Sequence, residues 1–263
     1  MTFDGEKMKK GLIKTPEEIA ILREGGKHLA RVLSAVRDAV KPGITTRELD
    51  QLAERLIREA GDEPAFLNYA PEGVKVAYPG TLCVSVNDEI VHGIAGDRVL
   101  KEGDIVGIDL GIKHNGLFTD SAVTVPVGRI DDSALKLIKA TEGALVAGID
   151  TARGGNTVGD IGYAIEKYVK DRGFVVVEEL GGHGVGHSQH EDPHVSNYGD
   201  RGQGDRLVPG MVIALEPIVN EGTRYIKLMP DKYTFVTRDH KRSAHFEHTI
   251  LITDGAPEIL TKV

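Results

Sequence analysis

Apolar residues recur at helical spacing in several stretches of the chain, each bounded by residues that start or stop helices. The first stretch, residues 16–40, opens with a capping box formed by Thr15 and Glu18 and ends at Pro42. Three further helices are predicted at residues 45–61, 133–149 and 157–172. Between the second and third helices the spacing changes to that of strands.

An alternating apolar and polar pattern at residues 103–111 predicts a strand with Asp109 on the face opposite its apolar neighbours. A turn signal at residues 114–116 predicts a hairpin, and residues 117–127 continue as its second strand. Folding about this turn places Asp120 opposite Asp109 or one diagonal step away on the same face, about 5–8 Å apart. The hairpin therefore brings two carboxylates together.

The two halves of the chain resemble each other. Residues 103–109 align with residues 210–216, so that Asp109 and Glu216 occupy equivalent positions, and the preceding helical segments match in the same order. Chance similarity of short apolar strings is the alternative, but it has to occur twice in the same order. We therefore predict an α+β fold, a pseudo-twofold duplicated unit of helices and antiparallel sheet with a carboxylate site between the halves.

Composition narrows the class of protein. The chain has 263 residues, 40% of them apolar, and no linker-like tract divides it, so we expect one domain over residues 1–263 with residues 1–14 as an N-terminal tail. A net charge of −8 argues against a nucleic-acid or anionic-membrane binder. A single cysteine, Cys83, excludes an internal disulfide, and no apolar leader or membrane span is present, so we expect a cytoplasmic protein.

Five potential ligands stand out because each lies in a short apolar or Gly-rich segment: Asp109, Asp120, His183, Glu216 and Glu247. An unpaired carboxylate is costly in a buried strand, so several of them together indicate a shared cation. Bare carboxylates at hairpin distance repel, and a pair of metal ions would turn that repulsion into ligation. Two exposed carboxylates beside a turn are the alternative for the hairpin taken alone.

The histidines require separate interpretation. Residues 190–194 match the H-E-x-x-H pattern of zinc peptidases, which works only on a helix. Pro193 and the Gly-rich residues 180–187 argue against a helix there. The same glycines allow the backbone to pass close to a metal or substrate at His183. His92 lies at the end of an apolar strand, and a lone histidine there is more often a satisfied core residue than a catalyst.

The segments around these residues together resemble those of methionine aminopeptidases of type I. The resemblance covers residues 15–262 and rests on residues 85–94, 109–120, 182–186, 215–217 and 246–249. It implies the pita-bread fold of the metallopeptidases and cotranslational removal of the initiator methionine from nascent proteins with a small second residue. Type I is indicated because no long insertion separates His183 from Glu216.

The resemblance also implies roles for the ligand candidates. Two divalent ions, Co, Mn, Fe or Zn, would be bound per chain. Asp109 would bind one ion, Asp120 and Glu247 would bridge the two, and His183 and Glu216 would complete the second site. A water or hydroxide bridging the metals would attack the first peptide bond.

Three catalytic residues follow from the same resemblance. Glu216 would move a proton to the leaving amine, His190 would contact the scissile carbonyl, and His92 would contact the amide region. Tyr78, Cys83 and Tyr233 would line the methionine pocket, although ordinary packing is an equal alternative for each. Bacterial type I enzymes often have an aromatic residue just before the second catalytic histidine, and this chain has Gln189 there. The resemblance therefore does not predict the rim of the pocket, although it still predicts the chemistry.

Two other function classes remain at this stage. A proline-directed metallopeptidase would share the five ligands, although the approximately 108 residues before Asp109 are too few for the additional domain of those enzymes. A noncatalytic binding protein on the same fold is the other. We expect a monomer that acts on nascent N-termini. A ribosome contact through basic residues and a solvated tail are alternative interpretations of Lys7, Lys9, Lys10 and Lys14.

Overall fold

The computed structural model describes residues 12–70, 73 and 75–262. Four α-helices lie within two residues of their predicted bounds: α1 Pro16–Ala39, α2 Thr46–Glu59, α3 Asp132–Thr151 and α4 Val158–Lys170. Thr15, Thr45 and Thr157 each accept a hydrogen bond from the third helical N–H in a complete capping box. Local capping chemistry therefore sets where these helices begin. Among the described residues, no helix combines the length and apolar character needed to cross a membrane.

The described strands pair antiparallel and form one large sheet and two small ones. Their bounds are β1 Glu63–Pro64, β2 Leu82–Val86, β3 Glu89–Val91, β4 Ile105–His114, β5 Leu117–Pro126, β6 Val175–Val176, β7 Gly181–Gly184, β8 Glu191–Ser196, β9 Val212–Leu215, β10 Ile218–Asn220, β11 Ile226–Leu228, β12 Phe235–Thr237, β13 Ser243–His245, β14 Glu247–Leu251 and β15 Glu258–Ile259. The large sheet has the order β1-β4-β5-β14-β9-β7-β8, with β2 paired to β4 and β15 to β14.

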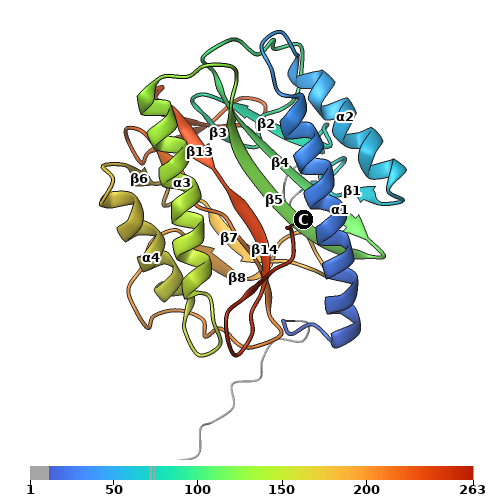
Figure 1. Ribbon diagram of the computed structural model, residues 1–263, viewed down its shortest axis with the longest axis vertical. Helices are drawn as coiled ribbons and strands as arrows, with labels where there is room; N and C mark the ends of the chain where they lie inside the picture. The colour runs from blue at the N-terminus through green and yellow to red at the C-terminus, as the bar shows by residue number, and fades with distance from the viewer. Residues whose placement is uncertain (1–11, 71–72, 74, 263) are drawn as a thin grey trace, which may run out of the picture.

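Each half of the large sheet has its own helix pair and its own hydrophobic core. Side chains of α1 and α2 pack on β2 and β4 in one core, and side chains of α3 and α4 pack on β9 and β14 in the other. Figure 1 shows α1 and α3 on the same side of the sheet, with β5 and β14 between them. This arrangement agrees with the predicted pseudo-twofold α+β fold, and it leaves the other side of the sheet for the candidate site.

The central hairpin has the predicted geometry. The strands β4 and β5 are joined by Asn115 and Gly116, whose φ angles of 46° and 87° lie in the left-handed region that a two-residue hairpin turn requires. Asp120 pairs with Gly111, two positions along β4 from Asp109. The two carboxylates are therefore one diagonal step apart on one face of the sheet, the second of the two predicted relations.

The chain differs from the predicted solvated tail at its inner end. Ile13 forms a β-bridge with Met211, and the backbone N–H of Lys14 donates to the carbonyl of Gly210. The Lys14 side chain is buried, and its ammonium lies 2.7 Å from Glu191. The tail interpretation of Lys14 is therefore wrong. Burial of an ammonium is costly unless a carboxylate compensates it, and Glu191 does so here. Residues Lys7, Lys9 and Lys10 lie outside the described residues.

The H-E-x-x-H match at residues 190–194 does not lie on a helix. Residues Glu191–Ser196 form β8 and not a helix. His190 and His194 consequently do not share a helical face, and the rejection of the helical zinc-peptidase pattern is confirmed.

Candidate metal centre

Five potential ligands meet on the side of the large sheet that faces away from the helices. They come from adjacent positions in the sheet: Asp109 from β4, Asp120 from β5, Glu247 from the start of β14, Glu216 from the residue after β9, and His183 from β7. All five line one cavity of about 100 Å³. The structure thus brings together residues that are separated by up to 138 positions in the sequence.

Burial and mutual repulsion dominate the electrostatics of this cluster. Burial raises the pKa of Asp120 to about 7 and that of Glu216 to about 8. The pKa values of Asp109 and Glu247 are raised well above the ordinary range, first by burial and then by the nearby charge of Asp120. The protein alone therefore does not compensate four ionised carboxylates at this point.

The donor atoms fit a divalent metal. Asp109 Oδ1, Asp120 Oδ1 and Glu247 Oε1 are buried and have no hydrogen-bond partner within the described part of the chain. Ligand atoms of Asp120, His183 and Glu247 all lie within 4.8 Å of one another. Oxygen-rich ligation with one imidazole suits Mn, Fe, Co or Zn.

The imidazole of His183 is oriented for ligation by its backbone contact. Its Nδ1 lies 2.9 Å from the carbonyl oxygen of Gly184, so the Nδ1–H donates there and the lone pair is on Nε2. Nε2 lies 3.6 Å from Glu216 Oε1. Burial lowers the pKa of His183 to about 3, which keeps this nitrogen available as an acceptor.

His245 is a member of the cluster that the sequence interpretation missed. Its Nε2 lies 3.4 Å from Glu216 Oε2 and 3.9 Å from Glu247 Oε2. Burial lowers the pKa of His245 to about 4, so the imidazole is neutral near pH 7. The detectable signal was its position two residues before Glu247, because strand residues two apart share a face.

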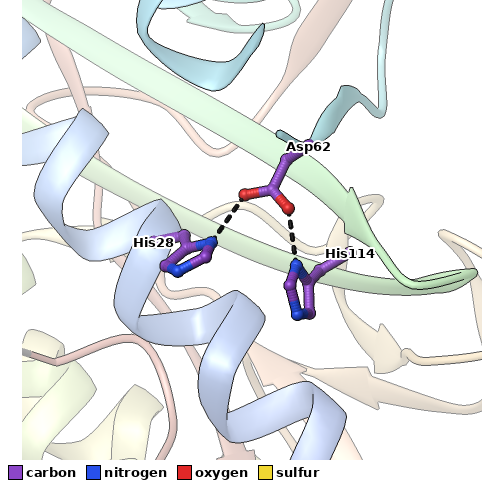
Figure 2. A group of neighbouring side chains, drawn as sticks. All are labelled: His28, Asp62 and His114. Atoms are coloured by element: carbon purple, nitrogen blue, oxygen red, sulfur yellow. Dashed lines mark hydrogen bonds and ion pairs between the residues drawn. The ribbon is translucent and has the colours of Figure 1, made fainter. Parts of the chain in front are cut away.

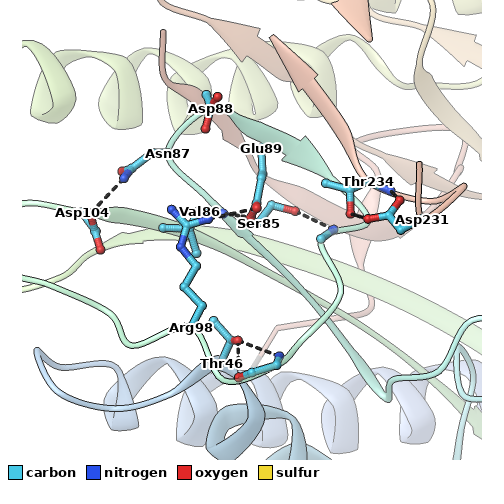
Figure 3. Close-up of polar contacts among 12 residues, drawn as sticks. Thr46, Ser85, Val86, Asn87, Asp88, Glu89, Arg98, Asp104, Asp231 and Thr234 are labelled. Atoms are coloured by element: carbon cyan, nitrogen blue, oxygen red, sulfur yellow. Dashed lines mark hydrogen bonds and ion pairs between the residues drawn. The ribbon is translucent and has the colours of Figure 1, made fainter. Parts of the chain in front are cut away.

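His92 reaches the cavity from a tightly held segment after β3. Its φ of 58° is in the left-handed region, and burial lowers its pKa to about 4. Figure 3 shows polar contacts around this segment, among them the 2.8 Å hydrogen bond from Val86 N–H to Glu89. Gly93 N–H also donates to Ser85, at 3.1 Å. The backbone on both sides of His92 is therefore held in place.

His190 lies at the mouth of the cavity. Its Nδ1 is 3.0 Å from the hydroxyl of Tyr69, and its ring centroid is 4.5 Å from that of His183. The following residue, Glu191, contacts Lys14 and accepts a 2.7 Å hydrogen bond from Ser188 N–H. These contacts connect the loop that carries His190 to the segment before α1.

The other wall of the cavity is apolar. Tyr78, Cys83 and Tyr233 are buried and pack together with Ala65 and Phe66. The Tyr78 hydroxyl donates to the carbonyl of Gly93 at 2.9 Å, and the Tyr78 and Tyr233 rings meet edge to face at 5.1 Å. The sequence interpretation missed Phe66 and Tyr69, which also line the cavity.

Gln189 likewise lines the cavity. Its side-chain oxygen is buried and has no hydrogen-bond partner among the residues that the structure describes. A polar acceptor therefore stands at the rim, next to His190.

Comparisons with known proteins agree with this geometry. The model of metallopeptidase family M24 matches residues 20–254. Methionine aminopeptidase 1 of Bacillus subtilis is 49% identical over 252 residues, which cover 96% of this chain and 99% of that protein. The methionine aminopeptidase of Clostridium perfringens is 44% identical over the same shares of both chains.

Solved structures agree as well. The methionine aminopeptidase of Thermotoga maritima superposes with a TM-score of 0.92 at 41% identity, covering 95% of this chain and 99% of that one. The prolidase of Pyrococcus horikoshii has a TM-score of 0.75 at 24% identity, covering 96% of this chain and 64% of that one, a likeness of fold alone. From the family match, the close relatives and the cluster of buried ligands, we conclude that this chain belongs to metallopeptidase family M24, within its methionine aminopeptidases.

Proposed function

We propose that the cavity is the active site in which this metallopeptidase removes the N-terminal methionine of nascent polypeptides, with a preference for a small second residue. The observation that carries the proposal is the convergence of four buried carboxylates and one imidazole beside an apolar wall. Such a cluster suits divalent metal and a peptide bond, and the wall suits a thioether side chain.

We assign two divalent ions to the five ligands Asp109, Asp120, His183, Glu216 and Glu247. The unpartnered oxygens of Asp109, Asp120 and Glu247 support this number, because a single ion leaves part of a four-carboxylate charge uncompensated. When bound, the ions would supply a Lewis acid for the scissile carbonyl and lower the pKa of water enough to make it a nucleophile at neutral pH.

The side chains around the ligands would move protons and stabilise charge. Glu216 lies among the other ligands, 3.6 Å from His183, so it would accept a proton from water and pass it to the leaving amine. His190, held by the Tyr69 hydroxyl, would donate to the developing oxyanion. His92 would contact the amide of the scissile bond.

The apolar wall would bind the methionine side chain. Tyr78, Cys83 and Tyr233 offer a buried surface without charge, and their mutual packing keeps that surface in place. A preformed apolar pocket of this kind suits an unbranched thioether. We further propose that the chain acts as a single-domain monomer.

The test is hydrolysis of Met-Ala-Ser by metal-stripped protein to which Mn, Co, Fe or Zn is returned separately. Activity that returns with metal and is lost in Glu216→Gln supports the proposal. An exposed control, Glu54→Gln on α2, should keep full activity. A companion peptide of the Gly-Pro type should remain uncleaved. Folded protein without turnover under any of the metals would overturn the proposal.

A further inference from the structure

A second cluster of metal-binding side chains lies outside the active site. His28 comes from α1, Asp62 from the turn after α2, and His114 from the end of β4. Figure 2 shows both imidazoles pointing toward the Asp62 carboxylate. His28 Nδ1 lies 2.9 Å from Asp62 Oδ2, and His114 Nδ1 lies 2.6 Å from Asp62 Oδ1.

The cluster is separated from the active site by the alternation of β4. Ile108, Leu110 and Ile112 face the core under α1 and α2, and His114 continues that face. Asp109 belongs to the opposite face and lies five residues away, about 17 Å along a strand. The two clusters therefore share no ligand.

Close packing of α1 against β4 brings the two histidines together. A Cβ added at Gly25 would lie 2.9 Å from the Cβ of His114, closer than real side chains approach. The absence of a side chain at Gly25 thus lets His114 pack directly against α1. Gly25 lies about one helical turn before His28, so His114 is close to His28 as well. Their rings meet edge to face with centroids 5.1 Å apart.

The donor atoms have the spacing of a metal site. One ligand atom each from His28, Asp62 and His114 lies within 4.8 Å of the other two. In tetrahedral zinc coordination with bonds of about 2.0–2.1 Å, ligand atoms lie about 3.3 Å apart, so small side-chain rotations suffice. The Nε2 atom of His114 points away from the cluster, 3.1 Å from Asn115 Nδ2 and 3.4 Å from Glu24 Oε2, so Nδ1 is the nitrogen that faces Asp62.

We propose that His28, Asp62 and His114 bind one Zn²⁺ ion, with solvent as the fourth ligand. Two imidazoles and one carboxylate select a late first-row ion over Mg²⁺ or Ca²⁺, which prefer oxygen. Asp62 is buried, whereas the His28 and His114 side chains are 21% and 12% exposed, so the ion has a path from solvent. The ion would fasten α1, the turn after α2 and the β4–β5 hairpin to one another.

The test counts Zn²⁺ per chain in the active protein and in the double variant His28→Gln/His114→Gln. The expected result is one Zn²⁺ fewer in the double variant by equilibrium dialysis, with unchanged Mn²⁺-supported hydrolysis of Met-Ala-Ser. His240→Gln is the matched control, because His240 also lies 2.9 Å from a carboxylate but has no second imidazole in its pair with Asp88. It should retain the wild-type number.

A second readout locates the ion. Crystals soaked in Zn²⁺ should show an anomalous peak at the zinc edge between the three side chains, and Zn²⁺ at a hundredfold excess over Kd should raise the wild-type melting temperature by about 5 °C more than that of the double variant. Equal Zn²⁺ counts, or no peak at the cluster, would overturn the proposal and leave Asp62 as a hydrogen-bonded brace. If the double variant does not fold, His28→Gln alone serves the same comparison. Because activity is measured separately, this result is independent of the proposed function.

Discussion

The two faces of β4 carry clusters of similar residues in opposite states. On one face, Asp109 belongs to a group of buried carboxylates with unpartnered oxygens and raised pKa values. On the other face, both oxygens of Asp62 accept from imidazoles. The comparison teaches that unsatisfied acceptors, not carboxylates as such, create the demand for a cation. Where imidazoles satisfy the carboxylate, a metal ion has to compete with protons.

The largest expected effect on activity comes from a change to Asp109, on the face of β4 that carries the unpartnered carboxylates. Asp109→Asn should lower hydrolysis of Met-Ala-Ser by at least about 10³-fold, because it removes an anionic ligand from the proposed metal pair. Metal content measured on the same sample should fall in parallel. Asp254→Asn, on an exposed loop, is the control and should behave as wild type. Full activity in Asp109→Asn would contradict the ligand assignment.

The next effect concerns the histidine that faces two of the carboxylates. His245→Gln should lower kcat/KM by about 10- to 100-fold, because a neutral imidazole 3.4 Å from Glu216 is placed to orient that carboxylate. The measurement is steady-state kinetics at saturating metal, compared with His240→Gln. Unchanged kinetics would show that His245 only fills space.

Metal removal should make stability depend on pH. Since Asp120 and Glu216 have folded pKa values near 7 and 8, above their ordinary 3.8 and 4.5, the folded state binds more protons than the unfolded state in this range. Stability of the metal-free protein should therefore fall as pH rises from 6.5 to 8, by about 2 kcal/mol.

Between pH 6.5 and 8 the carboxylates are the groups expected to set the slope of stability against pH. His183, His92 and His245 have lowered pKa values and contribute the opposite slope, but only below their ordinary 6.5. Saturating metal should remove the loss of stability above pH 6.5, because it compensates the ionised carboxylates. Chemical denaturation at several pH values, with and without metal, measures both. A metal-free protein whose stability is flat over this range would contradict the charge assignment.

The smallest effect on activity is expected on the other face of β4. Asp62→Asn should change hydrolysis less than about twofold, because the residue does not contact the cavity. It should lower the free energy of unfolding by about 1–3 kcal/mol, since a buried acceptor of two hydrogen bonds is weakened. Urea denaturation measures the second quantity. Loss of activity comparable to that of Asp109→Asn would show that the two faces are coupled.

Features with a local cause were predictable from the sequence. The helix starts follow from the capping residues Thr15, Thr45 and Thr157, and the central hairpin follows from Asn115 and Gly116. The placement of Asp109 and Asp120 on one face of the hairpin follows from that turn, and the structure decides that they are diagonal and not directly opposite. The five ligand candidates stood out for a similar reason, since charged residues in apolar strands are conspicuous in any short window.

The sequence by itself determined the helices, the hairpin and the family to which the chain belongs. Tertiary structure alone decided that His245 joins the carboxylates, that Lys14 is buried against Glu191, and that His28 meets His114 across Asp62. These contacts connect residues from different elements, and no local pattern encodes which helix face meets which strand. Their positions follow from packing, as the missing side chain at Gly25 illustrates, and packing is a property of the whole fold.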